Sequence, residues 1–391
     1  MRVLAPHPFP ARMAPELALA AISEVSAPGL VLDPMCGSGT VLHAAASAGF
    51  DALGFDLDPL AVLMSKVWTT PVDTGLIVPA AQALVRESLA DGSAGVELSW
   101  IDDDAETTAF INYWFAAAQR DDLRLLAAAL RSKTGPMADI LRLVLSRLIV
   151  TKDRGASLAR DVSHSRPHRV TLTNDFDVMR GFVRAAGQIS QRLGLSNLRG
   201  SASVALGDAR LLDRVADDSV ALVVTSPPYL NAIDYLRGHR LALVWMGHTL
   251  SDLRKIRGES IGSERGLSQP AHAILEELLS AVPVEQLDRR FGRILERYAH
   301  DLHQATFEIA RTLQPGGQVV FVVGNSTVRG VFVDNASITQ AAAEAAGLEL
   351  RTRAERDLPS SRRYLPPPSQ DGPGLHRRMR TEVVLRMQKA A

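Results

Sequence analysis

The sequence predicts an α/β fold built on a doubly wound sheet with two mostly helical insertions. Three short apolar runs, at residues 30–32, 52–55 and 220–224, are typical of strands buried in a parallel sheet. Each run ends in a polar loop, and the first loop is rich in glycine and leads into a helix-like segment at residues 41–46. Because ligands bind at the carboxyl ends of strands in such sheets, we expect the functional site at these loops.

The loop after the first strand has the character of a ligand-binding turn. It reads Asp33-Pro34-Met35-Cys36-Gly37-Ser38-Gly39-Thr40. Its two glycines permit a tight turn and a close approach of the main chain to a ligand. The second strand ends in Asp56, where doubly wound folds place an acid that binds ribose hydroxyls. The dinucleotide pattern Gly-x-Gly-x-x-Gly is not met, because residue 42 is leucine. A glycine turn that serves only packing is the alternative interpretation.

The loop after the third strand combines rigid acceptors with an aromatic ring. It reads Thr225-Ser226-Pro227-Pro228-Tyr229. The two prolines fix φ near about −65° and supply no main-chain N–H, so their carbonyls remain as rigid acceptors. Such a loop suits a planar substrate with an exocyclic NH2, which donates to the Ser226 oxygen and a proline carbonyl while its ring stacks on Tyr229. The alternative is a strand-to-loop turn that merely needs prolines.

Together the two loops resemble those of the S-adenosylmethionine-dependent amino-methyltransferases of DNA, whose catalytic loop reads Ser/Asp/Asn-Pro-Pro-Tyr/Phe. Serine preceded by threonine is most similar to the cytosine-N4 subgroup. The resemblance implies a Rossmann-like methyltransferase sheet and catalysis by Ser226, Pro227, Pro228 and Tyr229. It implies that S-adenosyl-L-methionine is bound by Asp33, Pro34, Gly37, Ser38, Gly39, Thr40, Asp56 and Asp208.

The resemblance covers roughly residues 1–66, 201–246 and 300–388. Residues 7–12 are similar to the family's N-terminal segment, which packs over the methionine end of the cofactor. Residues 204–209 are similar to the third strand, whose acid, here Asp208, lies near the adenine. Further along the chain, a helix end and turn are expected at residues 313–317, a buried strand at 318–325 and an edge strand at 382–386.

The predicted organisation alternates core and insertion. The core comprises residues 1–66, with the cofactor loop, residues 201–246, with the catalytic loop, and residues 313–391, which end in a basic segment. Residues 67–200 form a helical insertion that is the candidate for substrate recognition, and residues 247–312 form a second one. The clearest helices are expected at residues 116–130, 139–149, 273–279 and 284–313. Residues 258–263 read as a flexible polar loop to which no chemistry is assigned.

Charge is unevenly distributed although the chain as a whole is neutral. Residues 51–130 carry 13 acidic and 4 basic side chains, whereas residues 131–200 carry 13 basic and 5 acidic ones. Residues 351–391 carry 10 basic and 4 acidic side chains. The basic regions are consistent with a nucleic-acid cleft. Equally, they could pair with the acidic region across a domain interface.

One segment of the first insertion is rich in hydrogen-bond donors and lacks periodicity. Arginine and histidine on such a proline-bent loop suit phosphates and splayed bases. The candidate nucleic-acid-binding residues are Arg160, His164, Arg166, His168 and Arg169. A solvated surface loop is the alternative. We expect no metal site at His164 and His168, because no cysteine or acidic cluster completes one.

Just after the catalytic loop, Asp234 and Arg237 share one helix face, which favours a structural ion pair over substrate contact.

Composition excludes several classes of protein. The single cysteine, Cys36, rules out a disulfide within the chain and any cysteine-based zinc cluster, and it fits a reducing cytoplasm. We expect neither a membrane span nor a signal peptide, because no sufficiently long apolar run appears. Carbon-5 methylation of cytosine needs a thiolate, and the only thiol lies in the cofactor loop.

The sequence therefore predicts a cytoplasmic enzyme that methylates the exocyclic amine of a nucleic-acid base, with cytosine N4 in DNA as the favoured target, in a restriction-modification context. A base inside duplex DNA would have to be flipped out to reach Tyr229. An adenine-N6 enzyme, an RNA amino-methyltransferase of the guanine-N2 type, a non-catalytic cofactor-binding protein that binds nucleic acid, and a small-molecule or protein-amide methyltransferase remain open.

Overall fold

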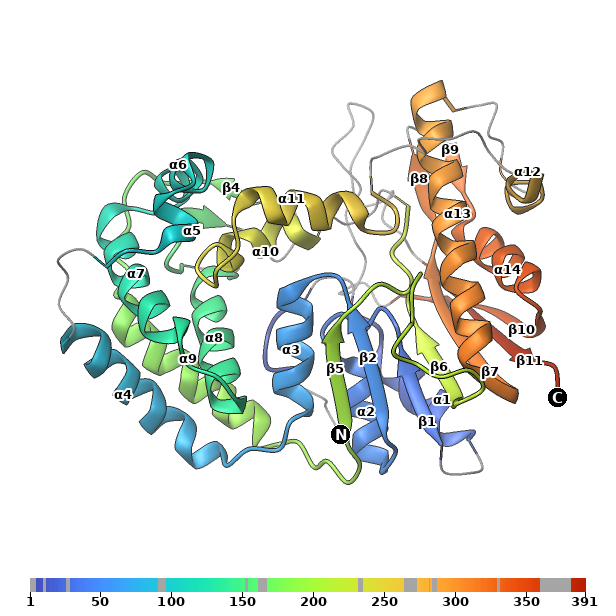
Figure 1. The fold of residues 1–391 in the computed structure, drawn as a ribbon, viewed down its shortest axis with the longest axis horizontal. Coiled ribbons are helices and arrows are strands. Elements are labelled where there is room, and N and C mark those ends of the chain that lie inside the picture. The colour runs from blue at the N-terminus through green and yellow to red at the C-terminus, as the bar shows by residue number, and fades with distance from the viewer. Residues whose placement is uncertain are drawn as a thin grey trace.

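The computed structural model describes most of the chain. The described residues are 5–9, 12–25, 29–90, 96–151, 154–160, 167–230, 235–263, 273–280, 282, 287–328, 331–358 and 381–391. Figure 1 shows a twisted sheet with helices packed along it and a second group of helices on one side. Among the described residues, no helix is long and apolar enough to cross a membrane.

The central sheet has seven strands among the described residues. Their spatial order is β10 (Leu348–Asp357), β11 (Thr381–Lys389), β7 (Leu313–Gly324), β6 (Val220–Thr225), β1 (Leu30–Asp33), β2 (Ala52–Asp56) and β5 (Ala202–Leu206). The five strands from β7 to β5 are parallel, and β11 and β10 are antiparallel additions. The chain leaves β1 toward β2, whereas β6 lies on the other side of β1. The strand order therefore reverses between β1 and β6, which is where doubly wound sheets bind ligands.

Both faces of the sheet are covered, because successive apolar residues of a strand point to opposite sides. On one face, Leu222 and Val224 pack with α1 (Pro15–Ser23) and α2 (Thr40–Ala48). On the other face, Val223 packs with the end of α13 (Arg289–Thr312) and with α14 (Asn335–Ala345). This double cover explains why the central strands read as unbroken apolar runs.

Two details of the predicted sheet are wrong. The terminal strand β11 is not an edge strand, because β10 pairs along its outer side. Strand β10 has the sequence LELRTRAERD and was not predicted. Most of its side chains are charged and exposed, which is typical of a strand at a sheet edge. In addition, residues 313–317, expected as a helix end and turn, already belong to β7, with a register shift against β6.

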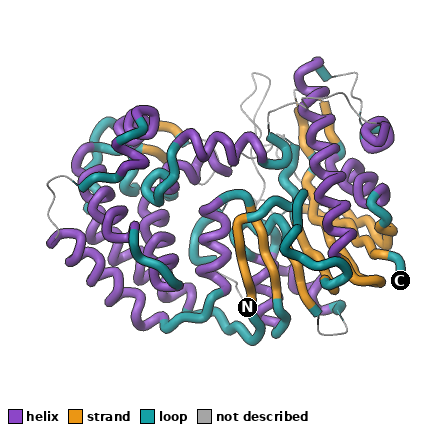
Figure 2. Tube along the Cα trace, in the orientation of Figure 1, coloured by secondary structure: helices purple, strands orange, loops and turns teal. Residues whose placement is uncertain are grey.

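The first insertion is a helical group beside the sheet (Figure 2). Its helices are α4 (Ile77–Ala90), α5 (Ser99–Asp102), α6 (Ala105–Trp114), α7 (Ala117–Arg131), α8 (Pro136–Ile149) and α9 (Val178–Leu193), preceded by the 3-10 turn η1 (Thr74–Leu76). A short hairpin pairs β3 (Ala159–Arg160) with β4 (His168–Arg169). The apolar core of this group is continuous with α3 (Pro59–Thr69) and α10 (Tyr235–Leu243) of the predicted methyltransferase core.

The second insertion connects the helical group to the far side of the sheet. Helix α11 (Leu250–Glu259) begins against the first insertion, where the Leu250 N–H donates to Thr107 at 3.0 Å. It ends above the sheet, as Figure 1 shows. The short helix α12 (Ala273–Leu278) then packs with α13 and α14. A second hairpin, β8 (Ser326–Val328) with β9 (Val331–Val333), follows β7.

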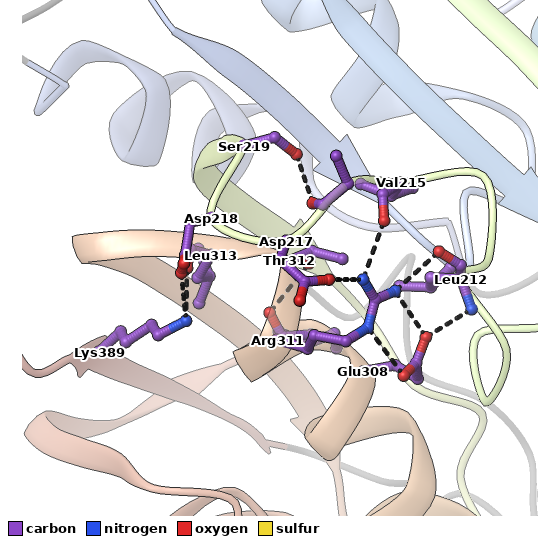
Figure 3. Close-up of polar contacts among 12 residues, drawn as sticks. Leu212, Val215, Asp217, Asp218, Ser219, Glu308, Arg311, Thr312, Leu313 and Lys389 are labelled. Carbon is purple, nitrogen blue, oxygen red and sulfur yellow. Dashed lines mark hydrogen bonds and ion pairs between the residues drawn. The ribbon is translucent and has the colours of Figure 1, made fainter.

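A network centred on Arg311 fastens the loop between β5 and β6 to the end of α13 (Figure 3). The Arg311 guanidinium pairs with Glu308 at 2.8 Å and with Asp217. It also donates to the carbonyls of Leu212 at 2.8 Å and Val215 at 3.0 Å. Because one planar group satisfies two carboxylates and two carbonyls, it fixes the course of this loop.

Helix α2 approaches β2 closely at one point. An added Cβ on Gly54 of β2 would lie 2.2 Å from Leu42 Cδ1 of α2. In the dinucleotide fold, the third glycine of the loop pattern provides close packing of helix on strand. Here that position is Leu42, and the glycine lies on the strand instead. The missing side chain of Gly54 on the strand thus makes room for Leu42 on the helix, where the dinucleotide fold has a glycine.

We expect Gly54→Ala to lower the free energy of unfolding by about 1–3 kcal/mol, the usual cost of overpacking a core. Urea denaturation would measure it. Gly187→Ala is the matched control, since Gly187 lies within α9 and its Cβ would meet only Val78, at 3.9 Å. That variant should be neutral or stabilising, because alanine is the better helix former. Equal effects of the two substitutions would contradict this interpretation.

Candidate active site

A pocket lies at the carboxyl ends of β1, β2, β5 and β6 and contains both loops singled out from the sequence. Its lining includes seven of the eight predicted cofactor residues, all except Gly39, and all four predicted catalytic residues. Further lining residues come from the N-terminal segment, the N-cap of α3, helices α10 and α11, and the residues that follow α11. They include Phe9, Arg12, Met13, Asp58, Leu236, Arg237, Arg257 and residues 260–263. The fold thus brings together segments that are far apart in the chain.

The glycine loop packs tightly against α3. Gly39 has φ +85°, and an added Cβ there would lie 2.6 Å from Ser65 Oγ and 3.0 Å from the Ser65 main chain. Only glycine fits this position. Ser65 also donates to the Gly37 carbonyl at 2.9 Å, which holds the turn against α3.

Asp56 lies at the end of β2 and faces the pocket. Its carboxylate accepts from the Gly37 N–H at 2.8 Å and from the Asp58 N–H at 2.9 Å. Burial raises the pKa of Asp56 to about 6, with a further contribution from the neighbouring charge of Asp58. Asp58 in turn caps α3 through Leu60 and pairs with the buried His239 of α10 at 2.5 Å. The acid expected to bind ribose hydroxyls is therefore held in a fixed orientation.

Two hydroxyl groups in the same loop fit a bound ligand. Ser38 Oγ and Thr40 Oγ1 are buried, line the pocket and have no hydrogen-bond partner within the described part of the chain. A buried hydroxyl without a partner costs free energy, so such groups usually await a ligand or ordered water. The loop therefore has donors and acceptors left over for a polar cofactor.

Asp33 joins the two loops directly. It is 3% exposed, and it accepts a hydrogen bond from Thr225 Oγ1 at 2.8 Å and one from the Met35 N–H at 3.2 Å. Burial raises the pKa of Asp33 to about 7. Thr225 immediately precedes Ser226, so this bond ties the start of the catalytic loop to the start of the cofactor loop.

The Ser226 hydroxyl is oriented by the neighbouring strand. Its Oγ donates to the Val322 carbonyl of β7 at 2.8 Å and lies 3.5 Å from the Tyr229 hydroxyl. Since the Ser226 proton is committed to Val322, the lone pairs of its oxygen remain available as acceptors. Tyr229 is half-buried, and burial raises its pKa to about 12, so its phenol stays neutral near pH 7.

Asp208 lies in the pocket wall but is not isolated. The Arg210 guanidinium binds its two carboxylate oxygens, with Nη2–Oδ2 at 2.6 Å and Nε–Oδ1 at 3.0 Å. Asp208 was predicted from the sequence, whereas its partner Arg210, only two residues away, was not.

Arg257 and residues 260–263 form a part of the pocket that was not predicted from the sequence. Residues 258–263 were expected to be a loop without chemistry, yet Ser260, Ile261, Gly262 and Ser263 line the pocket, as does Arg257. Polar loop composition alone carries no signal for such placement. Arg237 also lines the pocket, whereas Asp234, its expected partner, lies outside the described residues. The N-terminal segment reaches the pocket through Phe9, Arg12 and Met13, as the resemblance implies.

Three of the candidate nucleic-acid-binding residues lie on the short hairpin of β3 and β4 within the first insertion. Arg160 and His168 are paired across β3 and β4. Arg160 donates to the Ala159 carbonyl at 2.8 Å, and the Arg169 guanidinium lies 5.0 Å from the ring centroid of the exposed Tyr113. His164 and Arg166 lie outside the described residues.

The alternative of internal charge pairing receives only limited support. Lys133 of the basic region pairs with Glu87 of the acidic region at 2.9 Å. Neither Arg160 nor Arg169 forms an ion pair with an acid in the described ranges. Those ranges also contain no group of three or more histidine, cysteine or acidic residues that could hold a metal ion.

Comparison with known proteins identifies relatives over most of the chain. The sequence is 23% identical over 361 residues to the Type II methyltransferase M.MvaI of Kocuria varians, covering 84% of this chain and 78% of the relative. It is 24% identical over 217 residues to the Type II methyltransferase M.AvaI of Nostoc sp., covering 51% of this chain and 43% of that relative. The chain thus spans less than half the length of M.AvaI. No protein-family model matches the chain.

Solved structures give weaker likenesses. A SAM-dependent methyltransferase from Methanosarcina mazei is 9% identical, with 94% of this chain and 95% of that one covered and a TM-score of 0.33. A Thermus thermophilus protein complexed with S-adenosyl-L-methionine is 20% identical, with 47% of this chain and 52% of that one covered and a TM-score of 0.25. The Type II methyltransferase relatives confirm the predicted resemblance to the DNA methyltransferase family, and the sheet fits the α/β methyltransferase fold.

We expect Asp56→Asn to weaken cofactor binding by about 1–3 kcal/mol, the cost of losing a charged acceptor. The wild-type protein should lose affinity as the pH falls below about 6, because protonation of Asp56 removes acceptor capacity from its carboxylate. The affinity of the asparagine variant should not show this fall between pH 7 and pH 5. Calorimetry with S-adenosylhomocysteine from pH 5 to 8 would measure both effects.

Ser65→Ala serves as the control, since it removes a bond to the same loop without touching the pocket. Its affinity should keep the wild-type pH dependence. An Asp56→Asn profile that overlays the wild-type profile would remove Asp56 from the site.

Proposed function

We propose that this chain, which resembles Type II methyltransferases over most of its length, transfers a methyl group to the exocyclic amine of a DNA base, with cytosine N4 as the target. Its cofactor is S-adenosyl-L-methionine. The observation that carries the proposal is the Ser226 hydroxyl, which donates a hydrogen bond to the Val322 carbonyl, so that its oxygen is available as an acceptor inside the pocket. A cytoplasmic location remains a prediction from the single cysteine.

The cofactor side of the pocket needs only to bind and orient. When bound, the cofactor supplies a methyl group that is already electrophilic on its sulfonium. We assign the ribose hydroxyls to Asp56 and the close main-chain approach to Gly37, whereas Gly39 packs against Ser65 and supports the turn. Ser38 and Thr40 offer their unpartnered hydroxyls. No covalent enzyme intermediate is required, so positioning supplies the main catalytic effect.

The target side must turn a poor nucleophile into a better one. An exocyclic amine donates its lone pair into the ring, which lowers its nucleophilicity. If its two hydrogens are donated to Ser226 Oγ and the Pro227 carbonyl, the nitrogen is drawn toward tetrahedral geometry and its lone pair is localised. The bound cofactor would supply the methyl group to this lone pair and leave as S-adenosylhomocysteine, and the methylated amine would release its extra proton to water.

Cys36 argues against methylation at carbon. That reaction needs a thiolate to attack the cytosine ring, but Cys36 is 5% exposed and its Sγ lies 3.5 Å from Ser65 Oγ. Burial raises the pKa of its thiol well above the ordinary value. A buried neutral thiol is a weak nucleophile, so the reaction is assigned to an amine.

Duplex DNA is the proposed partner, with the target base flipped into the pocket. The candidate recognition element is the first insertion, with Arg160, His168 and Arg169 on its hairpin. Charged side chains on such a surface contact phosphates and set the register of the protein on DNA. The domain boundaries given from the sequence remain part of this proposal.

We expect Ser226→Ala and Tyr229→Ala to retain cofactor affinity and to lose methyl transfer. Loss of Tyr229 removes a base stack worth roughly 1–3 kcal/mol. Tyr229→Phe should keep most activity, because the ring rather than the hydroxyl carries this role. The assay incubates labelled cofactor with separate DNA and RNA pools and digests the products to nucleosides.

The digest also identifies the methylated base. N4-methylcytosine from DNA supports the proposal in full, N6-methyladenine corrects the base, and label only in RNA overturns DNA as the substrate. Near-normal turnover of Ser226→Ala would show that the loop is structural.

Replacing Arg160 and Arg169 together by glutamine should lower the log–log salt slope of duplex binding by roughly two, at about 0.9 per phosphate contact. The matched control replaces the exposed Arg180 and Arg184 of α9. If the two double variants give the same slope, the hairpin is not the DNA contact. Fluorescence anisotropy across a salt series provides the measurement.

A further inference from the structure

The segment that ends α11 and continues to Ser263 forms one wall of the pocket although no motif marks it. Residues 260–263 line the pocket together with the glycine loop. The segment is internally closed, because Ser263 Oγ donates to the Gly258 carbonyl at 3.2 Å and the Ser263 N–H donates to the Ser260 carbonyl at 3.1 Å. It is therefore a compact turn rather than an extended linker.

This turn touches the catalytic loop. Gly262 has φ +76°, and a Cβ added there would lie 3.4 Å from the Tyr229 carbonyl and 3.7 Å from the Tyr298 ring. Tyr298 of α13 is fully buried and lies beneath the turn. The main chain at Gly262 thus lies against the residue that we assign to base stacking.

Arg210 holds the turn in place. Its Nη2 donates to the Glu259 carbonyl at 2.7 Å, and its Nη1 pairs with Asp301 of α13 at 2.8 Å. Asp301 is 4% exposed and also pairs with Arg297, which donates to the Gly258 carbonyl at 3.0 Å. Two arginines therefore reach two successive carbonyls at the end of α11.

The same guanidinium binds Asp208 on the cofactor side of the pocket. Its Nη2 lies 2.6 Å from Asp208 Oδ2, and its Nε lies 3.0 Å from Oδ1. One planar group therefore contacts the acid in the cofactor wall and the turn in the target wall. A lysine could not reproduce this, since it offers a single point charge without the rigid fork.

We propose that Arg210 is a positioning residue that fixes, with one side chain, the Asp208 carboxylate toward the cofactor adenine and residues 258–263 against the target base. The inference rests on the proposed function and adds to it a second wall of the base pocket. It also assigns the turn a substrate-binding role that its sequence does not reveal.

The test compares Arg210→Lys with Arg311→Lys. Arg311 is a matched control, because it is also multiply bonded, links the same loop to the same helix, and does not line the pocket. Arg210→Lys should raise the dissociation constant of S-adenosylhomocysteine about tenfold and lower kcat by a similar factor, as expected for loss of charged hydrogen bonds. Arg311→Lys should lower the melting temperature but change the dissociation constant of S-adenosylhomocysteine and kcat by no more than about twofold.

A second readout separates positioning from general stabilisation. Asp208 can accept a hydrogen bond from the adenine amine, which S-inosylhomocysteine lacks. The wild-type protein should bind S-adenosylhomocysteine more tightly than S-inosylhomocysteine. The ratio of the two dissociation constants should fall toward one in Arg210→Lys and stay at the wild-type value in Arg311→Lys. If both variants keep the wild-type preference, or if both show the same losses, Arg210 has no positioning role.

Gly262→Ala tests the turn, with Gly247→Ala as its control. Gly247 also has positive φ, +97°, but an added Cβ there meets nothing within 4 Å. Gly262→Ala should raise the KM for DNA or lower kcat with unchanged S-adenosylhomocysteine affinity, and Gly247→Ala should change none of these. Normal kinetics of Gly262→Ala would remove the turn from the base pocket.

Failure of the proposed function would be distinguishable from failure of this inference. If the wild-type protein methylates no DNA, the proposed reaction is wrong. The binding comparison between adenine and hypoxanthine compounds uses no DNA, so it still decides whether Arg210 positions Asp208.

Discussion

The hydrogen bond between Thr225 and Asp33 is the constraint on which the site depends. It joins residues 192 positions apart at the carboxyl ends of two adjacent parallel strands. Because it is buried, its loss would leave the Thr225 hydroxyl unsatisfied and would remove one of the two hydrogen bonds that Asp33 accepts. These two residues are the first residues of the cofactor loop and the catalytic loop. Their mutual position is therefore set by the sheet and by this bond before any ligand binds.

Around this bond the pocket is assembled in layers of decreasing regularity. Parallel strands provide the floor, and their register fixes Asp33, Asp56 and Ser226 within one crevice. Asp56 and Ser65 then hold the glycine turn. Arginines with several partners hold the outer loops, as at Arg210 and Arg311. The reactive geometry thus derives from main-chain placement near the sheet and from guanidinium networks farther out.

Local signals predicted the central strands and both loops, because an apolar run, a glycine turn and a proline pair each restrict a few neighbouring residues. The charged strand β10 was missed since its side chains face solvent at a sheet edge, where apolar patterning is not required. Residues 258–263 were missed for a different reason. The Arg210 contact that holds them is to a residue 49 positions away, and nothing in the turn itself indicates that partner. Placement by a distant side chain leaves no local pattern to read.

The apolar core of the first insertion continues into α3 and α10, and this limits how the protein can diversify. A recognition module joined only by linkers can be exchanged between enzymes as a unit. Here Trp68 of α3 and Leu241 of α10 belong to the same core as Leu126 and Phe182 of the insertion. A chimaera that imports a foreign insertion must therefore import its complementary α3 and α10 faces too. Under the proposed recognition role of the first insertion, changes of specificity are therefore expected in surface loops, where they leave the shared core intact.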